Sequence, residues 1–510
     1  MQRREGEAGL EWEFDWITNR AKLSPHTVAI VHAEKGMNWT YSELNRRAAS
    51  AACWLKKQGV AKGDRVALMS PNHIAYFDLL FACTKLGAIF VPINWRLASY
   101  EIDYILKDCT PKLIGFHSHF AKKIAELDYV KLEPITFEID QEEYFNQSFA
   151  LEEEVEINER DPLAILYTGG TTGKPKGVVL SHQSIIWNGL NTVLSWNLSK
   201  EDTTLTYMPL FHTGGLNALS IPLLMVGGKV VIASEYHPIE AIHYLNQYHC
   251  TIVLLVPTMY HMMVNSDEFK KSRFPTVKIF LSGGAPCSLE IYKAFQSKGL
   301  TFKEGYGLTE AGPNNFYIDP DKVGEKLGSV GKPMLFNIVK IIKEDGTPAM
   351  DDEVGELLIK GNHVFLNYWN NPEATEEALS SDWLHTGDLA KKDHDGYYYI
   401  VGRKKEMIIT GGENVYPLEV EHWIAELPQV AEVAVVGLPD QKWGEIVAAF
   451  IVLKENEKVT REDIKEHCAR KLGNYKIPKS IIFLDQLPKT HVGKINKKEL
   501  KKHSNPASKK

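Results

Sequence analysis

Short apolar runs alternate with helical patterns along most of the chain. Residues 65–69 have the pattern of a strand, 73–86 that of a helix and 88–92 that of the next strand. The strand pattern returns at 163–167, 178–180, 229–233, 252–256 and 278–281. Strands that alternate with helices predict α/β layers around largely parallel sheets, and this limits the possible folds more than any other feature.

The pattern changes after Lys332. Short strands rich in β-branched and aromatic residues follow at 338–342, 356–359 and 397–401, and the pairs Asp345-Gly346 and Asp395-Gly396 separate them. Asp-Gly pairs between such strands are typical of hairpin turns. We therefore predict a small β-barrel-like subdomain in this part of the chain.

A compact α/β unit is expected from about Glu406, with strands at 430–436 and 447–453. Its helix opens at Thr460 with Asp463 three residues on, a capping-box pattern. The polar turn 402–405 precedes this unit, so we expect residues 1–404 to form a large N-terminal domain and 405–510 a small C-terminal one. The length of 510 residues, more than one hydrophobic core usually serves, agrees with this division.

Composition and charge exclude several classes of protein. The net charge of −7 argues against a nucleic-acid-binding surface, and the six scattered cysteines indicate neither disulfides nor a zinc site. The charged N-terminal stretch does not have the pattern of a signal peptide. Residues 204–228 carry no charged side chain, but Pro209, Pro222 and two glycine pairs interrupt them, so a buried segment is expected rather than a membrane span. A cytoplasmic location fits these features best.

One segment, residues 167–182, has the composition of a phosphate-binding loop. An apolar strand leads into glycines, threonine hydroxyls and lysines, which together provide backbone N–H groups, hydroxyls and positive charge for phosphate oxygens. Thr168 and Pro175 occupy positions where a Walker P-loop requires Gly and Ser or Thr, so the segment is not one. Taken alone, it is also compatible with an exposed surface loop.

Together with six other segments, this loop resembles the adenylate-forming superfamily of acyl- and aryl-CoA synthetases, luciferases and peptide-synthetase adenylation domains. The other segments, in the order found in that family, are 39–44 (WTYSEL), 85–92 (KLGAIFVP), 305–310 (GYGLTE), 385–388 (HTGD), 402–406 (GRKKE) and 488–494 (PKTHVGK). The resemblance implies a ligase that uses ATP, Mg²⁺ and coenzyme A, with a small carboxylic acid as the other substrate.

The resemblance also implies roles for individual residues. The triphosphate would be held by Thr168, Gly169, Gly170, Thr171, Thr172 and Lys176. Asp388 would accept hydrogen bonds from the ribose, Tyr306 would stack on adenine, and Gly284, Ala285, Gly305 and Gly307 would line the same ATP site. Thr309 would bind the α-phosphate, Glu310 and Thr172 would lie near Mg²⁺, and Arg403 would bind ribose or phosphate. Lys494 would stabilise the adenylation transition state.

Three further roles follow from the resemblance. His212 would act as a gate between the acid and coenzyme A. Lys405 would be the hinge about which the C-terminal domain rotates between two half-reactions. Gly411 and Gly412 would then line the tunnel for coenzyme A, because they carry no side chain. Cys287 is expected to be buried rather than reactive, since no basic neighbour in the sequence lowers its pKa.

The identity of the acid is left open by the sequence. The expected acyl pocket consists of His212, Gly214, Gly215, Leu216, Gly283, Gly284 and Gly307. Its glycines suggest room for a medium- or long-chain fatty acid, and an aryl acid of the cinnamate or succinylbenzoate type is the alternative. Two other classes stay open: an adenylating enzyme with another acceptor, such as a carrier-protein thiol, and a catalytically inactive adenylate-binding module. A peripheral membrane contact and a homodimer also stay open.

Overall fold

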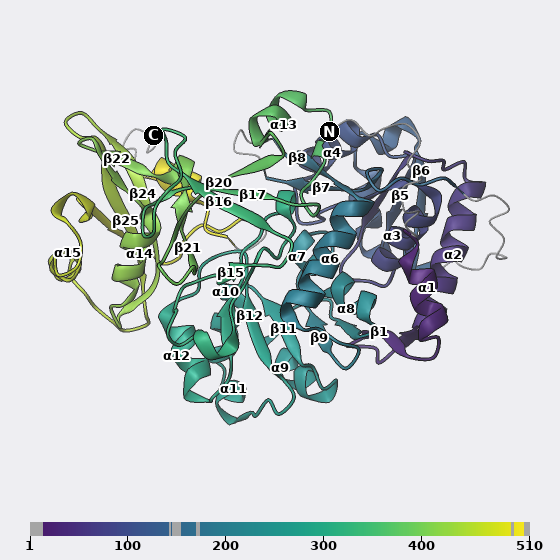
Figure 1. Cartoon of the computed structure of the whole chain (residues 1–510), viewed down its shortest axis with the longest axis horizontal. Helices are drawn as coiled ribbons and strands as arrows, with labels where there is room; N and C mark the ends of the chain where they lie inside the picture. Colours follow the sequence, from purple (N-terminus) through teal and green to yellow (C-terminus); the bar gives the residue numbers. More distant parts are fainter. Residues whose placement is uncertain (1–13, 142–143, 145–154, 170–173, 491–493, 504–510) are drawn as a thin grey trace.

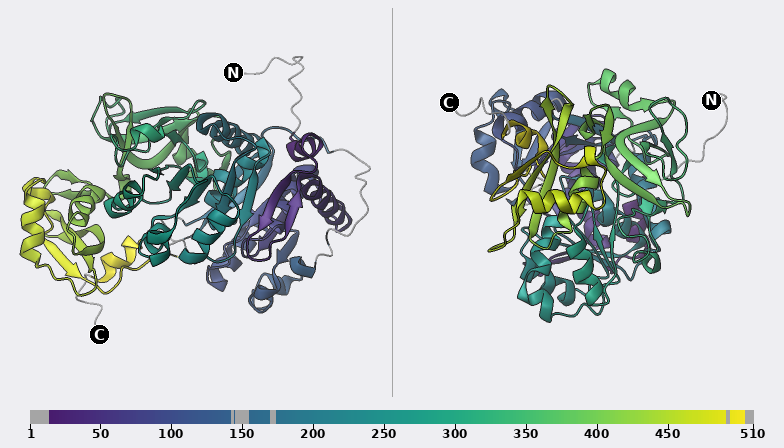
Figure 2. Two further views of the ribbon diagram at one scale, coloured as in Figure 1. Left: turned by 90° about the horizontal axis from the view of Figure 1, so that it is seen from below. Right: turned by 90° about the vertical axis from the view of Figure 1, so that its left-hand side faces the viewer.

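The computed structural model describes residues 14–141, 144, 155–169, 174–490 and 494–503 (Figure 1). It has a large N-terminal domain of layered sheets and helices and a smaller C-terminal domain. The C-terminal domain, coloured yellow-green to yellow, lies at one end of the long axis (Figure 1 and Figure 2). The α/β class predicted from the alternation of strands and helices is confirmed.

Two seven-stranded sheets form the N-terminal domain. In spatial order, the first consists of β13 (Phe302–Glu304), β12 (Ile279–Ser282), β11 (Ile252–Leu255), β9 (Thr203–Thr206), β10 (Lys229–Ile232), β1 (Val28–His32) and β2 (Asn38–Thr40). The second consists of β18 (Asn367–Tyr368), β8 (Lys176–Ser181), β7 (Pro162–Thr168), β4 (Ile89–Pro92), β3 (Arg65–Met69), β5 (Leu113–Phe116) and β6 (Ile135–Glu138). Most neighbours are parallel, as predicted, but β2, β8 and β18 pair antiparallel.

One apolar core joins these two sheets. It contains residues from both sheets and from the helices α2 (Tyr41–Lys57), α3 (Ala75–Leu86), α6 (His182–Trp196) and α8 (Ile221–Val226). In α3 every residue except Lys85 is buried. A helix that is enclosed on all sides must pair its polar groups. The Asp78 carboxylate of α3 forms a bidentate ion pair with the Arg47 guanidinium of α2, whose Nε and Nη2 both donate to it.

The remaining helices of the N-terminal domain lie around these sheets. They are α1 (Trp16–Leu23), α4 (Ser99–Cys109), α5 (Ala121–Ala125), α9 (Pro238–Gln247), α10 (Pro257–Val264), α11 (Asp267–Lys271), α12 (Leu289–Ser297) and α13 (Pro372–Ala378). The short helix α7 (Thr213–Gly215) continues into a π-helical turn, η5 (Leu216–Ser220).

The predicted hairpins form a third, antiparallel sheet of β16 (Ile338–Ile342), β17 (Gly355–Lys360), β19 (Leu379–Ser380), β20 (Trp383–Lys392) and β21 (Tyr398–Arg403). A two-stranded sheet, β14 (Phe316–Tyr317) with β15 (Lys332–Pro333), lies beside it in the sequence. The turn at Asp395-Gly396 connects β20 to β21, with Asp393 N–H donating to the Tyr397 carbonyl.

The C-terminal domain contains β22 (Ile408–Thr410), β23 (Glu413–Val415), β24 (Val430–Asp440), β25 (Gly444–Leu453), β26 (Ser480–Phe483), α14 (Pro417–Ala425), α15 (Arg461–Ala469) and α16 (Lys497–His503). The capping box at Thr460 and Asp463 is confirmed. The buried residues of this domain form two apolar clusters, and neither shares a member with the N-terminal core. The domain therefore has a hydrophobic core of its own.

Residues 204–228 form β9, α7, η5 and α8, and most of them are buried, as expected. Within the described residues, no helix is both long and apolar enough to cross a membrane. All six cysteines are free thiols, and five are fully buried.

Lys303 of β13 is an exception to the apolar core. It is 1% exposed, and its amine has no hydrogen-bond partner in the described part of the chain. The Nζ atom lies 4.7 Å from the ring centre of Trp196 and 4.4 Å from that of Tyr317, so two cation–π contacts replace hydrogen bonds. Burial nevertheless lowers the pKa of Lys303 from its ordinary 10.5 to about 7.

The substitution Lys303→Met should raise the thermal midpoint of unfolding at pH 6.5, since a buried polar group without a partner typically costs about 1–3 kcal/mol. Between pH 7 and 10.5 the unfolded state binds more protons than the folded state, so the stability of the unsubstituted protein rises with pH across this window. The advantage of Lys303→Met should therefore shrink as the pH is raised from 7 to 10. Lys293→Met, at an exposed site on α12, is the control and should change little. A gain independent of pH would contradict this account.

Candidate active site

The loops that follow β12 and β13 meet the paired strands β20 and β21 beyond the carboxyl ends of β12 and β13. β12 leads into the loop 283–288, and β13 leads into 305–308 and the 3-10 turn η6 (Thr309–Ala311). The neighbouring strands β20 and β21 bring Asp388 opposite Arg403. In open α/β sheets, ligands bind beyond the carboxyl ends of the strands, so this region is the place to look for a site.

The carboxylate of Asp388 lies at the centre of this region and is 3% exposed. Its Oδ2 accepts a hydrogen bond from the Tyr306 hydroxyl at 2.6 Å, and its Oδ1 lies 2.5 Å from Arg403 Nε. Burial raises the pKa of Asp388, and the charge of Arg403 is the largest effect that opposes this. The remaining lone pairs of the carboxylate are suited to accept hydrogen bonds from the hydroxyls of a ribose.

Glu310 and Lys176 come together at Tyr368. The Tyr368 hydroxyl donates to Glu310 Oε1 at 2.8 Å, and Lys176 Nζ lies 4.9 Å from the centre of the Tyr368 ring. Thr309, next to Glu310, is buried. Lys176, at the end of the phosphate-binding loop, and the Thr-Glu pair therefore share one region.

Part of the predicted phosphate-binding loop is described. Thr168 pairs with Lys176 across β7 and β8, and Gly169 is exposed, with no atom within 4 Å of the position that a Cβ would take. Gly170, Thr171 and Thr172 lie outside the described residues.

The side chains around Glu310 fit a magnesium site of the kind found in nucleotide-binding proteins. Among the described residues, no group of three or more His, Cys, Asp or Glu side chains is arranged to hold a metal. Mg²⁺ in nucleotide sites usually keeps one or two carboxylates together with phosphate oxygens and water. The single carboxylate of Glu310, near Lys176, agrees with that type of site.

Lys494 reaches this site from the C-terminal domain. A Cβ at Gly284 would lie 3.9 Å from Lys494 Cε, so the lysine stem passes over this glycine. Burial has the largest effect on the pKa of Lys494 and lowers it. The charge of Arg403 lowers this pKa further, whereas the charges of Asp388 and Glu310 raise it. The lysine thus lies within electrostatic reach of both carboxylates.

His212 lies in the same region, within reach of the charge of Lys494. Its Nδ1 accepts a hydrogen bond from the Gly214 N–H at 3.1 Å, so Nε2 carries the proton of the neutral ring. Burial, and then the charge of Lys494, lowers the pKa of His212 to about 4. The side chain is therefore neutral at pH 7 and adds no positive charge to the site.

The loops after β12 and β13 hold the other predicted residues of the ATP site and of the acyl pocket. Gly283 and Gly305 are partly buried, whereas Gly284 and Ala285 are exposed. Sequence reasoning missed the anchor of these loops, Glu304, whose Oε1 accepts from Cys287 N–H at 3.1 Å and from the Tyr292 hydroxyl at 2.9 Å. Burial raises the pKa of Glu304 to about 7 and that of the Cys287 thiol above its ordinary value, in agreement with an unreactive cysteine.

Three residues expected to line the acyl pocket have other roles. A Cβ at Gly215 would lie 2.3 Å from the Pro209 carbonyl oxygen, and one at Gly307 would lie 2.1 Å from that of Pro313. A side chain at either position would collide with the backbone of the chain, which accounts for the glycine there. Leu216 is 0% exposed and belongs to the N-terminal core. The expectation that they line the acyl pocket stays a prediction.

The predicted hinge and coenzyme A residues lie on the surface of the C-terminal side. Lys405 is exposed in the 3-10 turn η8 (Lys404–Glu406). Gly411 and Gly412 are exposed in the turn between β22 and β23, and a Cβ at Gly411 would meet only the Trp443 ring, at 2.8 Å. In this state the glycine turn thus contacts its own domain and does not join the residues around Asp388.

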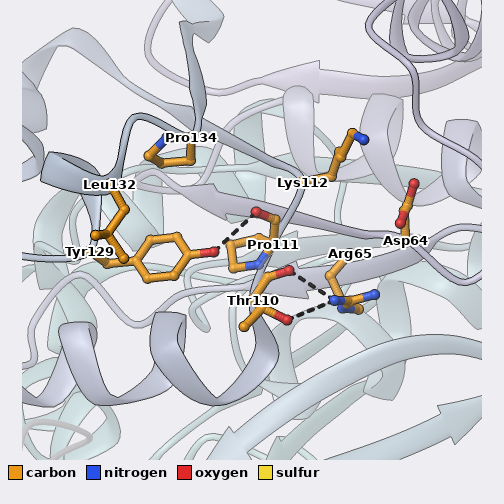
Figure 3. Close-up of a pocket in the computed structure, with 8 residues that line it drawn as sticks. All are labelled: Asp64, Arg65, Thr110, Pro111, Lys112, Tyr129, Leu132 and Pro134. Atoms are coloured by element: carbon orange, nitrogen blue, oxygen red, sulfur yellow. Dashed lines mark hydrogen bonds between the residues drawn. The ribbon is translucent and has the colours of Figure 1, made fainter.

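A surface pocket at the edge of the second sheet is separate from this site. It is lined by Asp64, Arg65, Thr110, Pro111, Lys112, Tyr129, Leu132 and Pro134 (Figure 3). The Arg65 guanidinium already donates to the carbonyl and hydroxyl oxygens of Thr110. None of the predicted site residues lies in this pocket.

Comparisons with known proteins agree with the geometry. Residues 17–369 match the family described as AMP-binding enzyme, and 419–494 match the AMP-binding enzyme C-terminal domain. The chain belongs to this family. It is an ATP-dependent, AMP-forming acyl-CoA synthetase that uses ATP, Mg²⁺ and coenzyme A.

Three relatives illustrate the range of acids. Feruloyl-CoA synthase from an Amycolatopsis species is 37% identical over 491 residues, which are 96% of this chain and 98% of that protein. Long-chain-fatty-acid–CoA ligase FadD13 from Mycobacterium tuberculosis is 36% identical over 497 residues, 95% of this chain and 97% of that protein. O-succinylbenzoate coenzyme A synthetase from Bacillus subtilis, in complex with ATP and magnesium ion, has a TM-score of 0.85 at 30% identity and covers 96% and 99% of the two chains.

Proposed function

We propose that this acyl-CoA synthetase activates an aromatic carboxylic acid and transfers the acyl group to coenzyme A. A carboxylate oxygen attacks the α-phosphorus of ATP and pyrophosphate leaves. The sulfur of coenzyme A then attacks the acyl carbon, its proton passes to solvent and AMP leaves. The observation that carries the proposal is the position of Lys494 over Gly284, within electrostatic reach of Asp388 and Glu310.

In this proposal each side chain has a physical task. Asp388 accepts hydrogen bonds from the ribose while Tyr306, held by its own bond to Asp388, presents its ring to the adenine. Thr309 donates to the α-phosphate, and Lys176 with the phosphate-binding loop holds the leaving pyrophosphate. Glu310 would help to hold Mg²⁺, which would supply positive charge to the phosphates. Lys494 offsets the charge that develops on the α-phosphate in the transition state, which is often the largest catalytic contribution.

The 37% identity to feruloyl-CoA synthase supports an aromatic acid. A Cβ at Gly215 or Gly307 would meet backbone atoms, and Leu216 is part of the core. His212, Gly214, Gly283 and Gly284 remain as the lining. His212 is uncharged, so it separates the acid from coenzyme A by its size rather than by its charge.

A medium- or long-chain fatty acid is the second candidate. The 36% identity to the long-chain-fatty-acid–CoA ligase favours it. The exposed Gly284 also favours it, because a Cβ there would meet nothing closer than Val256 Cγ1 at 3.8 Å.

A panel of acids separates these two candidates. We expect kcat/KM for cinnamate to exceed that for every straight-chain acid from C4 to C16 by at least about tenfold, because an enzyme for aromatic acids binds their transition state more tightly than that of a straight-chain acid. A fatty-acid pocket would instead give a rise of roughly fourfold for each added methylene, from about 0.8 kcal/mol per buried CH₂. Such a rise would overturn the aromatic proposal and leave the ligase mechanism in place.

The two half-reactions test the role of Lys494. Lys494→Ala should slow formation of the acyl-adenylate roughly 100- to 1000-fold, because a preorganised cation is lost from the transition state. Thioester formation from synthetic acyl-AMP should persist near the unsubstituted rate. Lys502→Ala, at an exposed position on α16, is the matched control and should affect neither step. Equal losses in both half-reactions would exclude the proposed role.

We also propose that the domains divide between residues 404 and 405 and that Lys405 is the pivot. The turn η8 joins β21 of the N-terminal domain to β22 of the C-terminal one, and Met407 N–H donates to the Arg403 carbonyl across it. Pivots are usually a few residues at the end of an element, which suits this turn. Rotation there would withdraw Lys494 and bring the Gly411-Gly412 turn to the acyl-adenylate.

Restricting this pivot should separate the half-reactions. Lys405→Pro fixes φ of residue 405 near −65°. The 3-10 turn tolerates this value, but a fixed φ opposes the backbone change that the proposed rotation about residue 405 requires. We expect adenylate formation to be retained and thioester formation to fall by at least about tenfold. Lys405→Ala, which keeps the backbone free, is the control and should support both steps. Unchanged thioester formation in the proline variant would place the pivot elsewhere.

A further inference from the structure

A single carboxyl group ties together the two loops that follow β12 and β13. Glu304 ends β13, and the parallel register of the two strands sets it opposite Ser282, the last residue of β12. The loop 283–288 leaves β12 and returns to Glu304, whose Oε1 accepts from Cys287 N–H at 3.1 Å. The same oxygen accepts from the hydroxyl of Tyr292 in α12 at 2.9 Å. Three segments of the chain therefore meet at one oxygen atom.

Both loops lead from this carboxyl group to the proposed nucleotide site. Gly284 lies in the first loop, beneath the stem of Lys494. The second loop begins directly after Glu304, and the hydroxyl of its Tyr306 donates to Asp388. Glu304 is thus placed to set the spacing between the loop under Lys494 and the loop that is tied to Asp388.

A glutamine at position 304 would offer the same acceptor oxygen without a titrating group. Glu304 is partly buried, and burial raises its pKa from the ordinary 4.5 to about 7, although the Cys287 N–H and the Tyr292 hydroxyl lower it. Among the described residues, no cation contributes to this shift. Burial also raises the pKa of Cys287, of Tyr292 and of Tyr260 in α10, which Cys287 influences. Of these four groups, Glu304 alone changes its charge near pH 7.

We infer that Glu304 is a positioning residue that acts as an uncharged acid: it holds the loops 283–288 and 305–308 together and adds no negative charge beside the nucleotide. The triphosphate is an anion, so an ionised Glu304 repels it through a partly buried region, where water and salt screen charges weakly. The protonated carboxyl group keeps both hydrogen bonds to Oε1 without this repulsion. The inference rests on the proposed placement of ATP beside Tyr306 and Asp388.

Binding of ATP with Mg²⁺ at two pH values tests this role and does not require the acid to be known. Isothermal titration calorimetry gives the Kd at pH 6 and at pH 8.5. We expect the ratio of the two Kd values to be at least about threefold larger for the unsubstituted protein than for Glu304→Gln, which keeps the acceptor and cannot ionise. The titrations of ATP itself and of Lys494 are common to both proteins and cancel in this comparison.

Three further variants define the role of each contact. Glu304→Leu leaves the Cys287 N–H and the Tyr292 hydroxyl without their acceptor, so Kd should rise roughly fivefold or more at both pH values. Tyr292→Phe removes a donor that favours the ionised form, so the increase in Kd should move to higher pH. Glu240→Gln, at an exposed position on α9, is the matched control and should keep the pH dependence of the unsubstituted protein.

Thermal unfolding shows separately that the variants fold and that the carboxyl group titrates. Because the folded pKa of Glu304 lies above the unfolded one, its contribution to stability is complete below pH 4.5 and is lost as the pH rises through 7. Glu304→Gln should escape this loss. A Kd ratio in Glu304→Gln equal to that of the unsubstituted protein would overturn the inference, whether or not unfolding shows the titration. A misplaced nucleotide would appear differently, as a Kd for ATP that Tyr306→Ala leaves unchanged.

Discussion

The buried carboxylate of Asp388 is the interaction on which the geometry of the site depends. A charge that is 3% exposed is tolerated only with close partners, and Tyr306 and Arg403 are those partners. Tyr306 belongs to the loop after β13, and Arg403 ends β21 two residues before Lys405. One carboxylate therefore holds together the loop after β13 and the end of β21, next to the turn that leads into the C-terminal domain.

Much of the fold was predictable because it depends on local patterns. The alternation of strands and helices, the Asp-Gly hairpins and the capping box at Thr460 are short-range features, and all three are present in the structure. The antiparallel direction of β8 was not predictable in this way. A loop of seven residues after β7 is too short for a helical crossover, but only the pairing of Thr168 with Lys176 shows that the strand turns back.

The site was predictable where a residue type has one purpose and not where it has two. Asp388, Tyr306 and Lys494 came from motifs, and the structure brings them together. A glycine, in contrast, can make room for a ligand or for the backbone, and the sequence does not distinguish Gly284 from Gly307. Glu304 and Tyr368 were missed because their importance comes from contacts between distant segments, which leave no local signal.

The separate core of the C-terminal domain has a thermodynamic consequence. Its apolar clusters share no residue with the N-terminal core, so the proposed rotation of this domain would leave both cores intact. The contacts that rotation changes include ion pairs such as Lys454 with Glu290, 3.4 Å apart, in the two domains. Because salt screens such exposed ion pairs, the balance between the proposed orientations should depend on ionic strength.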